Sequence, residues 1–185
     1  MSTLITGLVV FFAIHLLPTW PALRNRLQQR LGERGYQALF ALIALVGLVL
    51  IAGGMARAPF EPLYTPPTWG RMFAALVLLP AFMLLAAAYL PGNVRRYTRH
   101  PMLWAVALWA TAHLAANGDR ASVLLFGSFL AYALVDMLSA TLRGAQKQTA
   151  RWPLVRDAYA AILGLVVYAG VMRAHPWLFG VEVFA

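Results

Sequence analysis

Three polar side chains lie inside long apolar runs of this sequence, and they are its best candidates for chemistry. His15, His113 and Asp136 are each surrounded by aliphatic and aromatic residues. A neutral imidazole offers a nitrogen lone pair to a metal, and a carboxylate can orient such an imidazole. Ionisable residues are costly inside a bilayer, so those that occur there often mark a functional site. These three residues are therefore expected to bind a group or to bond a neighbouring helix.

His15 and His113 form the best pair of candidate metal ligands. They lie in different apolar runs, so two helices would each offer one imidazole to the iron of a haem. Phe11 and Trp109 precede them by one helical turn on the same face and provide flat apolar surface. An interhelical hydrogen bond is the commoner explanation for a single histidine inside a membrane. From the residues alone, both interpretations stay open.

Asp136 and a basic cluster could complete a cofactor site. Asp136 would orient or charge a histidine, or else bond a neighbouring helix or a snorkelling arginine. The basic cluster stands before the fourth apolar run, where a proline in the first helical turn and the helix N-terminus favour an anion. It would hold haem propionates or another acidic cofactor group, or else lipid headgroups. Its members are Arg95, Arg96, Arg99, His100 and Pro101.

The composition requires an integral membrane protein. Of the 185 residues, 62% are apolar or aromatic and only 11% are charged, and a soluble fold of this length could not cover so much apolar surface. The chain has no cysteine, which excludes disulfides, thiolate metal sites and cysteine nucleophiles. The net charge of +9 comes from short loops between apolar runs. It therefore indicates anionic lipid headgroups as partners, and no nucleic acid.

Six apolar runs predict an all-α fold, a polytopic membrane bundle with six transmembrane helices. Only helices satisfy every backbone polar group within one lipid-exposed segment of this kind. We expect residues 1–185 to form a single transmembrane domain. The predicted spans are residues 3–20, 36–56, 72–90, 101–116, 121–142 and 158–172.

The segments between the spans predict how the helices begin and end. Residues 24–34 place leucines at four-residue spacing among arginines, which predicts a basic amphipathic helix on the membrane surface. Asn117 and Gly118 should end the fourth span with the glycine at positive φ, and Asp119 should cap the fifth span.

Basic residues also predict the orientation of the chain, because cytoplasmic loops carry an excess of Lys and Arg. Eleven of the 15 basic residues follow the first, third and fifth spans. Both termini are therefore expected on the non-cytoplasmic side of a bacterial inner membrane. The eleven are Arg24, Arg26, Arg30, Arg34, Arg95, Arg96, Arg99, Arg143, Lys147, Arg151 and Arg156.

Several motifs are distributed over nearly the whole chain, namely His15-Leu-Leu-Pro, Pro66-Pro67-Thr68-Trp69-Gly70-Arg71, Leu90-Pro91-Gly92-Asn93, Arg99-His100-Pro101-Met102-Leu103, the stretch 109–119, and Gly127-Ser-Phe-Leu-Ala with Asp136. Together they resemble those of the NnrU family of small bacterial membrane proteins. The family name is associated with nitrite and nitric oxide metabolism, and no reaction is firmly attached to it.

The family is similar to plant 15-cis-zeta-carotene isomerase, a membrane enzyme that uses haem b. Two histidines implicated in holding that iron match His15 and His113, so the resemblance implies haem b bound between them. It implies a redox or isomerase-like role and a hydrophobic small-molecule substrate. A cysteine described as an alternative ligand matches Ala110 here, which excludes a thiolate switch. The other residues assigned to the cofactor are Trp109 and Asp136 beside the histidines, and Arg95, Arg99 and His100 near the propionates.

Two other functions remain as alternatives. Arg99-His100-Pro101 with the later Asp136 is similar to membrane methyltransferases of the isoprenylcysteine carboxyl methyltransferase group, which hold S-adenosylmethionine. Those enzymes carry a pair of acids, whereas this chain has one. A non-enzymatic assembly or regulatory subunit is the third class, and it predicts neither cofactor.

Overall fold

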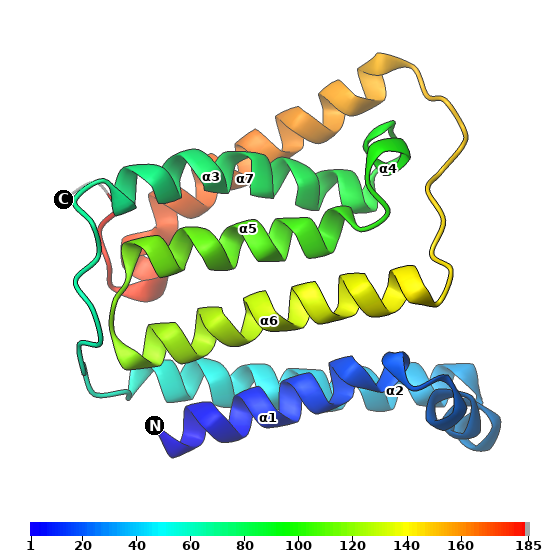
Figure 1. Ribbon diagram of the computed structural model, residues 1–185, viewed down its shortest axis with the longest axis horizontal. Helices are drawn as coiled ribbons and strands as arrows, with labels where there is room; N and C mark the ends of the chain where they lie inside the picture. Colours follow the sequence, from blue (N-terminus) through cyan, green and yellow to red (C-terminus); the bar gives the residue numbers. More distant parts are fainter. Residues whose placement is uncertain (184–185) are drawn as a thin grey trace. The chain divides into compact units, whose positions relative to one another are not determined.

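The computed structural model describes residues 1–183, and this part of the chain is helical without a strand (Figure 1). Five segments are long and apolar enough to cross a membrane, namely Ser2–Thr19, α2, α3, α6 and α7, and α5 is apolar but shorter. The protein is therefore an all-α, multi-pass membrane protein. In chain order the elements are α1 (Ser2–Leu16), the 3-10 turn η1 (Leu17–Thr19), α2 (Pro21–Ala56), α3 (Gly70–Tyr89), α4 (Val94–Tyr97), α5 (Pro101–Ala116), α6 (Arg120–Leu142) and α7 (Leu154–Phe179).

The predicted helix bounds agree best at α5, which begins at Pro101 and ends at Ala116 as expected. Helix α7 is longer than predicted, since it begins directly after Pro153 and ends at Phe179, before Gly180, which has a φ of 70°. The predicted surface helix and the second span are both parts of α2. The helix is kinked at Gly32, whose φ of 71° and ψ of 166° are accessible almost only to glycine. The kink lies within the predicted surface helix, so that helix is interrupted two residues before its predicted end at residue 34.

The chain forms two compact units, which are described separately. Unit 1 contains Met1–Leu63 and Asp119–Ser128. Unit 2 contains Tyr64–Gly118 and the described residues from Phe129 onward.

Unit 1 is built on the close packing of α1 along α2 (Figure 1). A Cβ atom added to Gly54 would lie 2.5 Å from the Cα of Leu4. The same addition at Gly47 would meet the backbone nitrogen of Phe11 at 2.8 Å, and at Gly7 that of Ile51 at 2.6 Å. Small residues let two backbones approach in this way. These three glycines therefore make the contact between α1 and α2 possible.

Unit 2 is built around α3, which packs against α5 and α7. Ala74 and Leu78 of α3 form a buried cluster with Ala112 of α5, and Trp109 and Tyr168 pack against it. Further along, Ala86 and Ala87 pack with Ala160 of α7. A Cβ on Gly164 would lie 2.6 Å from the Cα of Met83, so α7 also meets α3 through a glycine.

The junction between α5 and α6 confirms one prediction and corrects another. Asp119 caps α6 as predicted, since its Oδ1 accepts a hydrogen bond from the Ser122 N–H at 3.0 Å. The positive φ predicted at Gly118 is wrong, because the described glycines with positive φ are Gly32, Gly144 and Gly180. Glycine is needed at 118 for its size, since the carbonyl oxygen of Tyr64 lies where a Cβ would be.

Candidate functional site

His15 lies half-buried in the last turn of α1 in unit 1. Its Nδ1 lies 2.7 Å from the carbonyl oxygen of Phe11. Because a carbonyl oxygen only accepts, Nδ1 carries the proton and Nε2 carries the lone pair. The ring stacks on Phe11, with 3.9 Å between centroids, and makes an edge contact with Phe40 at 5.1 Å. The histidine is thus oriented by its own helix and placed among aromatic rings.

His113 has the same arrangement in the last turn of α5 in unit 2. Its Nδ1 donates to the carbonyl oxygen of Trp109 at 2.8 Å, which again leaves the lone pair on Nε2. The ring centroid lies 5.2 Å from that of Trp109. Trp109 in turn makes an edge contact with Phe129 at 5.4 Å. The predicted neighbourhood of Trp109 and His113 is therefore confirmed.

A cavity of about 90 Å³ borders His113 within unit 2. His175, Arg71, Asn117 and Glu182 also line it, together with apolar residues of α3 and α7. Ligand pockets usually hold roughly 300 to 1,000 Å³. This cavity therefore accommodates only a small ligand beside the imidazole.

Asp136 is held by two neighbours on α6. Its Oδ2 accepts a hydrogen bond from the Tyr132 hydroxyl at 3.3 Å, and its Oδ1 lies 3.6 Å from a guanidinium nitrogen of Arg143. Of the partners predicted for this carboxylate, the structure thus shows the snorkelling arginine. A role of Asp136 behind a haem-bound histidine stays a prediction.

His100 and the preceding arginines lie at the start of α5. The Nε2 of His100 lies 3.1 Å from the Thr141 hydroxyl. Burial lowers the pKa of His100 below 6.5, Arg99 lowers it further, and the Asp136 carboxylate acts in the opposite direction. Unit 2 therefore brings His100 within electrostatic range of Asp136. The guanidinium of Arg95 donates to the carbonyl oxygen of Ala88 near the end of α3.

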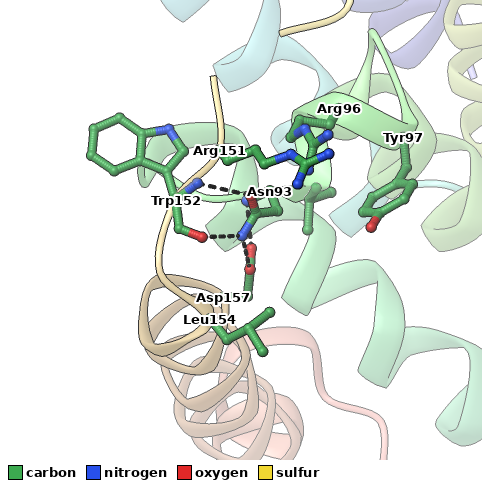
Figure 2. A pocket seen from close by; sticks show the side chains of 8 residues that line it. Asn93, Arg96, Tyr97, Arg151, Trp152, Leu154 and Asp157 are labelled. Atoms are coloured by element: carbon green, nitrogen blue, oxygen red, sulfur yellow. Dashed lines mark hydrogen bonds between the residues drawn. The ribbon is translucent and has the colours of Figure 1, made fainter. Parts of the chain in front are cut away.

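A polar junction that the sequence analysis missed joins the turn before α4 to the start of α7 (Figure 2). The backbone N–H of Asn93 donates to Oδ1 of Asp157 at 2.6 Å, and its Nδ2 donates to Oδ2 of Asp157 at 2.6 Å. The Asn93 amide also exchanges two hydrogen bonds with the backbone of Trp152, at 2.8 and 2.9 Å. A Cβ on Gly92 would lie 2.7 Å from Oδ1 of Asp157. Asn93, 7% exposed, is thus the centre of this junction.

Comparison with known proteins agrees with the motifs. A family model described as NnrU protein matches residues 3–183. The chain belongs to the NnrU family. No curated protein and no solved structure matches it.

For this NnrU chain, the donors of the candidate site can be compared with what a bare metal ion and a haem each require. Within residues 1–183, no three His, Cys, Asp or Glu side chains gather to hold a metal ion. A porphyrin supplies the equatorial ligands of its iron, so one or two imidazoles suffice to hold a haem. The donor chemistry of His15 and His113 fits that requirement, because each Nδ1 is bonded and the lone pair is on Nε2.

Proposed function

We propose that this NnrU protein crosses a bacterial inner membrane six times, with both termini on the non-cytoplasmic side. Helix α5, the fourth apolar helix in chain order, would cross the membrane in addition to the five longer segments. Its 16 residues reach about 24 Å, somewhat less than the roughly 30 Å of a hydrocarbon core. The basic residues that follow α1, α3 and α6 support this orientation.

The chain is well suited to a test of this topology because it has no cysteine. A membrane-impermeant maleimide applied to intact spheroplasts should label a Thr68→Cys variant and leave a Gln28→Cys variant unlabelled. The unaltered chain is the blank. Labelling of Gln28→Cys in sealed spheroplasts would show that the chain has the opposite orientation to the one proposed.

We propose further that the protein binds haem b with His15 and His113 as axial ligands. The observation that carries this proposal is a hydrogen bond common to both imidazoles: each Nδ1 donates to the carbonyl four residues earlier, which places the lone pair on Nε2. Such a bond is the usual partner of a metal-bound imidazole. The cavity beside His113 holds about 90 Å³, so the space there must widen when haem binds.

Other residues would serve the cofactor indirectly. Phe11 and Trp109 keep the imidazole planes in place through ring contacts. Arg99 would neutralise the propionates, and His100 would donate a hydrogen bond to them. Bound haem supplies one-electron transfer, and two axial histidines suit a redox role in nitrite or nitric oxide metabolism. An isomerase-like reaction on a hydrophobic substrate would need one histidine to leave the iron.

The visible spectrum tests the haem proposal. Protein purified from haem-replete cells should show a Soret band with the signature of two axial histidines. His15→Ala and His113→Ala should each lose this signature, whereas Gln29→Ala, at an exposed position of α2, should keep it. Absence of a Soret band in the unaltered protein, or a His113→Ala spectrum identical to it, would contradict the proposal.

A second candidate function is favoured by one observation, the placement of Asp136 within electrostatic range of His100. An S-adenosylmethionine site would require the Arg99-His100-Pro101 stretch and the acid in one place, and the charge of Asp136 acts on His100. Calorimetric titration with S-adenosylmethionine should then show binding that Arg99→Ala weakens. Titration without heat would remove this candidate.

A further inference from the structure

A second and larger cavity opens between α4 and the start of α7 in unit 2 (Figure 2). Its volume is about 300 Å³, which reaches the lower end of ordinary ligand pockets. Arg96 and Arg151 line it with two guanidinium groups, and Tyr97 and Trp152 line it with two aromatic rings. In Figure 2 the side chain of Arg151 extends toward Arg96.

Two guanidinium groups and one carboxylate line this cavity, so its charge is net positive. Within residues 1–183, neither Arg96 nor Arg151 forms an ion pair with a carboxylate. One carboxylate, that of Asp157, lines the cavity, and both of its oxygens already accept hydrogen bonds from Asn93. Two like charges facing one space repel each other, and an anion between them would relieve that repulsion.

The walls of the cavity are held in place before any ligand binds. Asn93 fastens the turn before α4 to Trp152 and Asp157. Gln148 adds two bonds between the same segments, since its N–H donates to the Arg95 carbonyl at 3.0 Å and its Nε2 to the Gly92 carbonyl at 3.2 Å. The backbones that carry Arg96 and Arg151 are thus fixed, which lowers the entropic cost of binding.

The exposed residues around the cavity favour a lipid as the molecule that would carry an anionic group into it. Tyr97 is 76% exposed, Leu154 80% and Trp152 37%. Amphipathic aromatic side chains beside exposed apolar ones are typical of the level of the lipid headgroups. Guanidinium forks match phosphate oxygens geometrically, and an apolar rim suits the glycerol and upper acyl carbons of a lipid.

We propose that this cavity binds the phosphate of an anionic phospholipid headgroup between Arg96 and Arg151, with Tyr97 and Trp152 beside it. The site is independent of the haem proposal, because it shares none of the proposed haem ligands. It differs from general attraction of basic loops to a membrane, because it places two particular arginines around one bound phosphate.

Binding of a short-chain lipid to the full-length protein in an uncharged detergent tests this site. Dihexanoyl phosphatidylglycerol should bind more tightly than dihexanoyl phosphatidylcholine, which carries the same phosphate with a cationic choline. The double variant Arg96→Ala/Arg151→Ala should weaken phosphatidylglycerol binding by roughly thirtyfold, because two arginine contacts with the anion are lost. Arg96→Lys/Arg151→Lys should bind phosphatidylglycerol with an intermediate affinity, because the positive charges are kept and the bidentate guanidinium contacts are lost.

A matched control separates this site from net charge. Arg24→Ala/Arg26→Ala removes the same charge from exposed residues of α2 and should leave the affinity within twofold. Equal weakening in both double variants, or equal binding of the two lipids, would overturn the proposal. Displacement of the lipid by inorganic phosphate at concentrations comparable with the lipid's own would assign the cavity to free phosphate and overturn the lipid assignment. Equal thermal midpoints without lipid would show that the variants stay folded.

Discussion

In unit 1, α1 and α2 are joined backbone to backbone through Gly7, Gly47 and Gly54, whereas in unit 2 the turn before α4 and the start of α7 are joined by the hydrogen bonds of Asn93. Unit 2 also uses close packing, but in mid-helix at Gly164. Close packing through glycine therefore occurs in both units, at helix ends as well as in mid-helix. Unit 2 adds a hydrogen-bonded junction between a turn and the start of a helix.

The largest effect is expected from filling a glycine contact in unit 1. Gly54→Ala places a Cβ 2.5 Å from the Leu4 Cα, so α1 must move off α2, at a cost of about 3 kcal/mol. Gly170→Ala on α7 is the matched control, because an added Cβ there meets no atom within 4 Å. Unfolding in detergent should show a lower midpoint for Gly54→Ala only. Similar midpoints for the two variants would mean that close packing does not hold unit 1 together.

A smaller loss is expected from the polar junction of unit 2. Asn93→Ala removes its side-chain bonds to Asp157 and Trp152 and leaves one carboxylate oxygen without its donor, at a cost of about 2 kcal/mol. Asn117→Ala, which removes the side-chain hydrogen bond to the His113 carbonyl, should cost about half as much. The same unfolding measurement compares them. A larger loss at Asn117 would contradict the central role of Asn93.

The smallest effect is expected in the pH dependence of stability, and it arises from His100 at the polar start of α5. Burial, with the help of Arg99, lowers the pKa of His100 below 6.5 in the folded protein. The unfolded chain therefore takes up this proton at a higher pH, and stability falls as the pH drops below 6.5 toward the lowered pKa. Thermal midpoints measured from about pH 8 to about pH 5 should show this decline. His100→Gln should flatten it, and His175→Gln should retain it. An unchanged profile in His100→Gln would assign the decline to another group.

Much of the helical architecture was predictable because its signals are local. The bounds of α5 follow from a proline in its first turn and from Asn117 just after its end. Helix α7 was underestimated because Arg156, Asp157, Arg173 and His175 near its ends are polar, although all four belong to the helix. Hydropathy detects the part of a helix that lies in lipid, and it does not detect polar turns that extend beyond it.

The candidate site was predictable to the same extent. Trp109 and Phe11 lie against the histidines because each stands four residues earlier on the same helix. Asn93 and Asp157 could not be paired from the sequence, because their contact joins common polar residues across 64 positions of chain. The size restriction at Gly118 also depends on a distant partner, the carbonyl oxygen of Tyr64.

The length of chain between Asn93 and Asp157 has a consequence for biosynthesis. Translation of the 64 residues that follow Asn93, up to and including Asp157, takes about 3 to 13 s at ordinary elongation rates. Throughout that delay, the Asn93 amide in the turn after α3 cannot form its hydrogen bond, because Asp157 has not yet been synthesised. Unit 2 can therefore close only late, when the ribosome has supplied the beginning of its last helix.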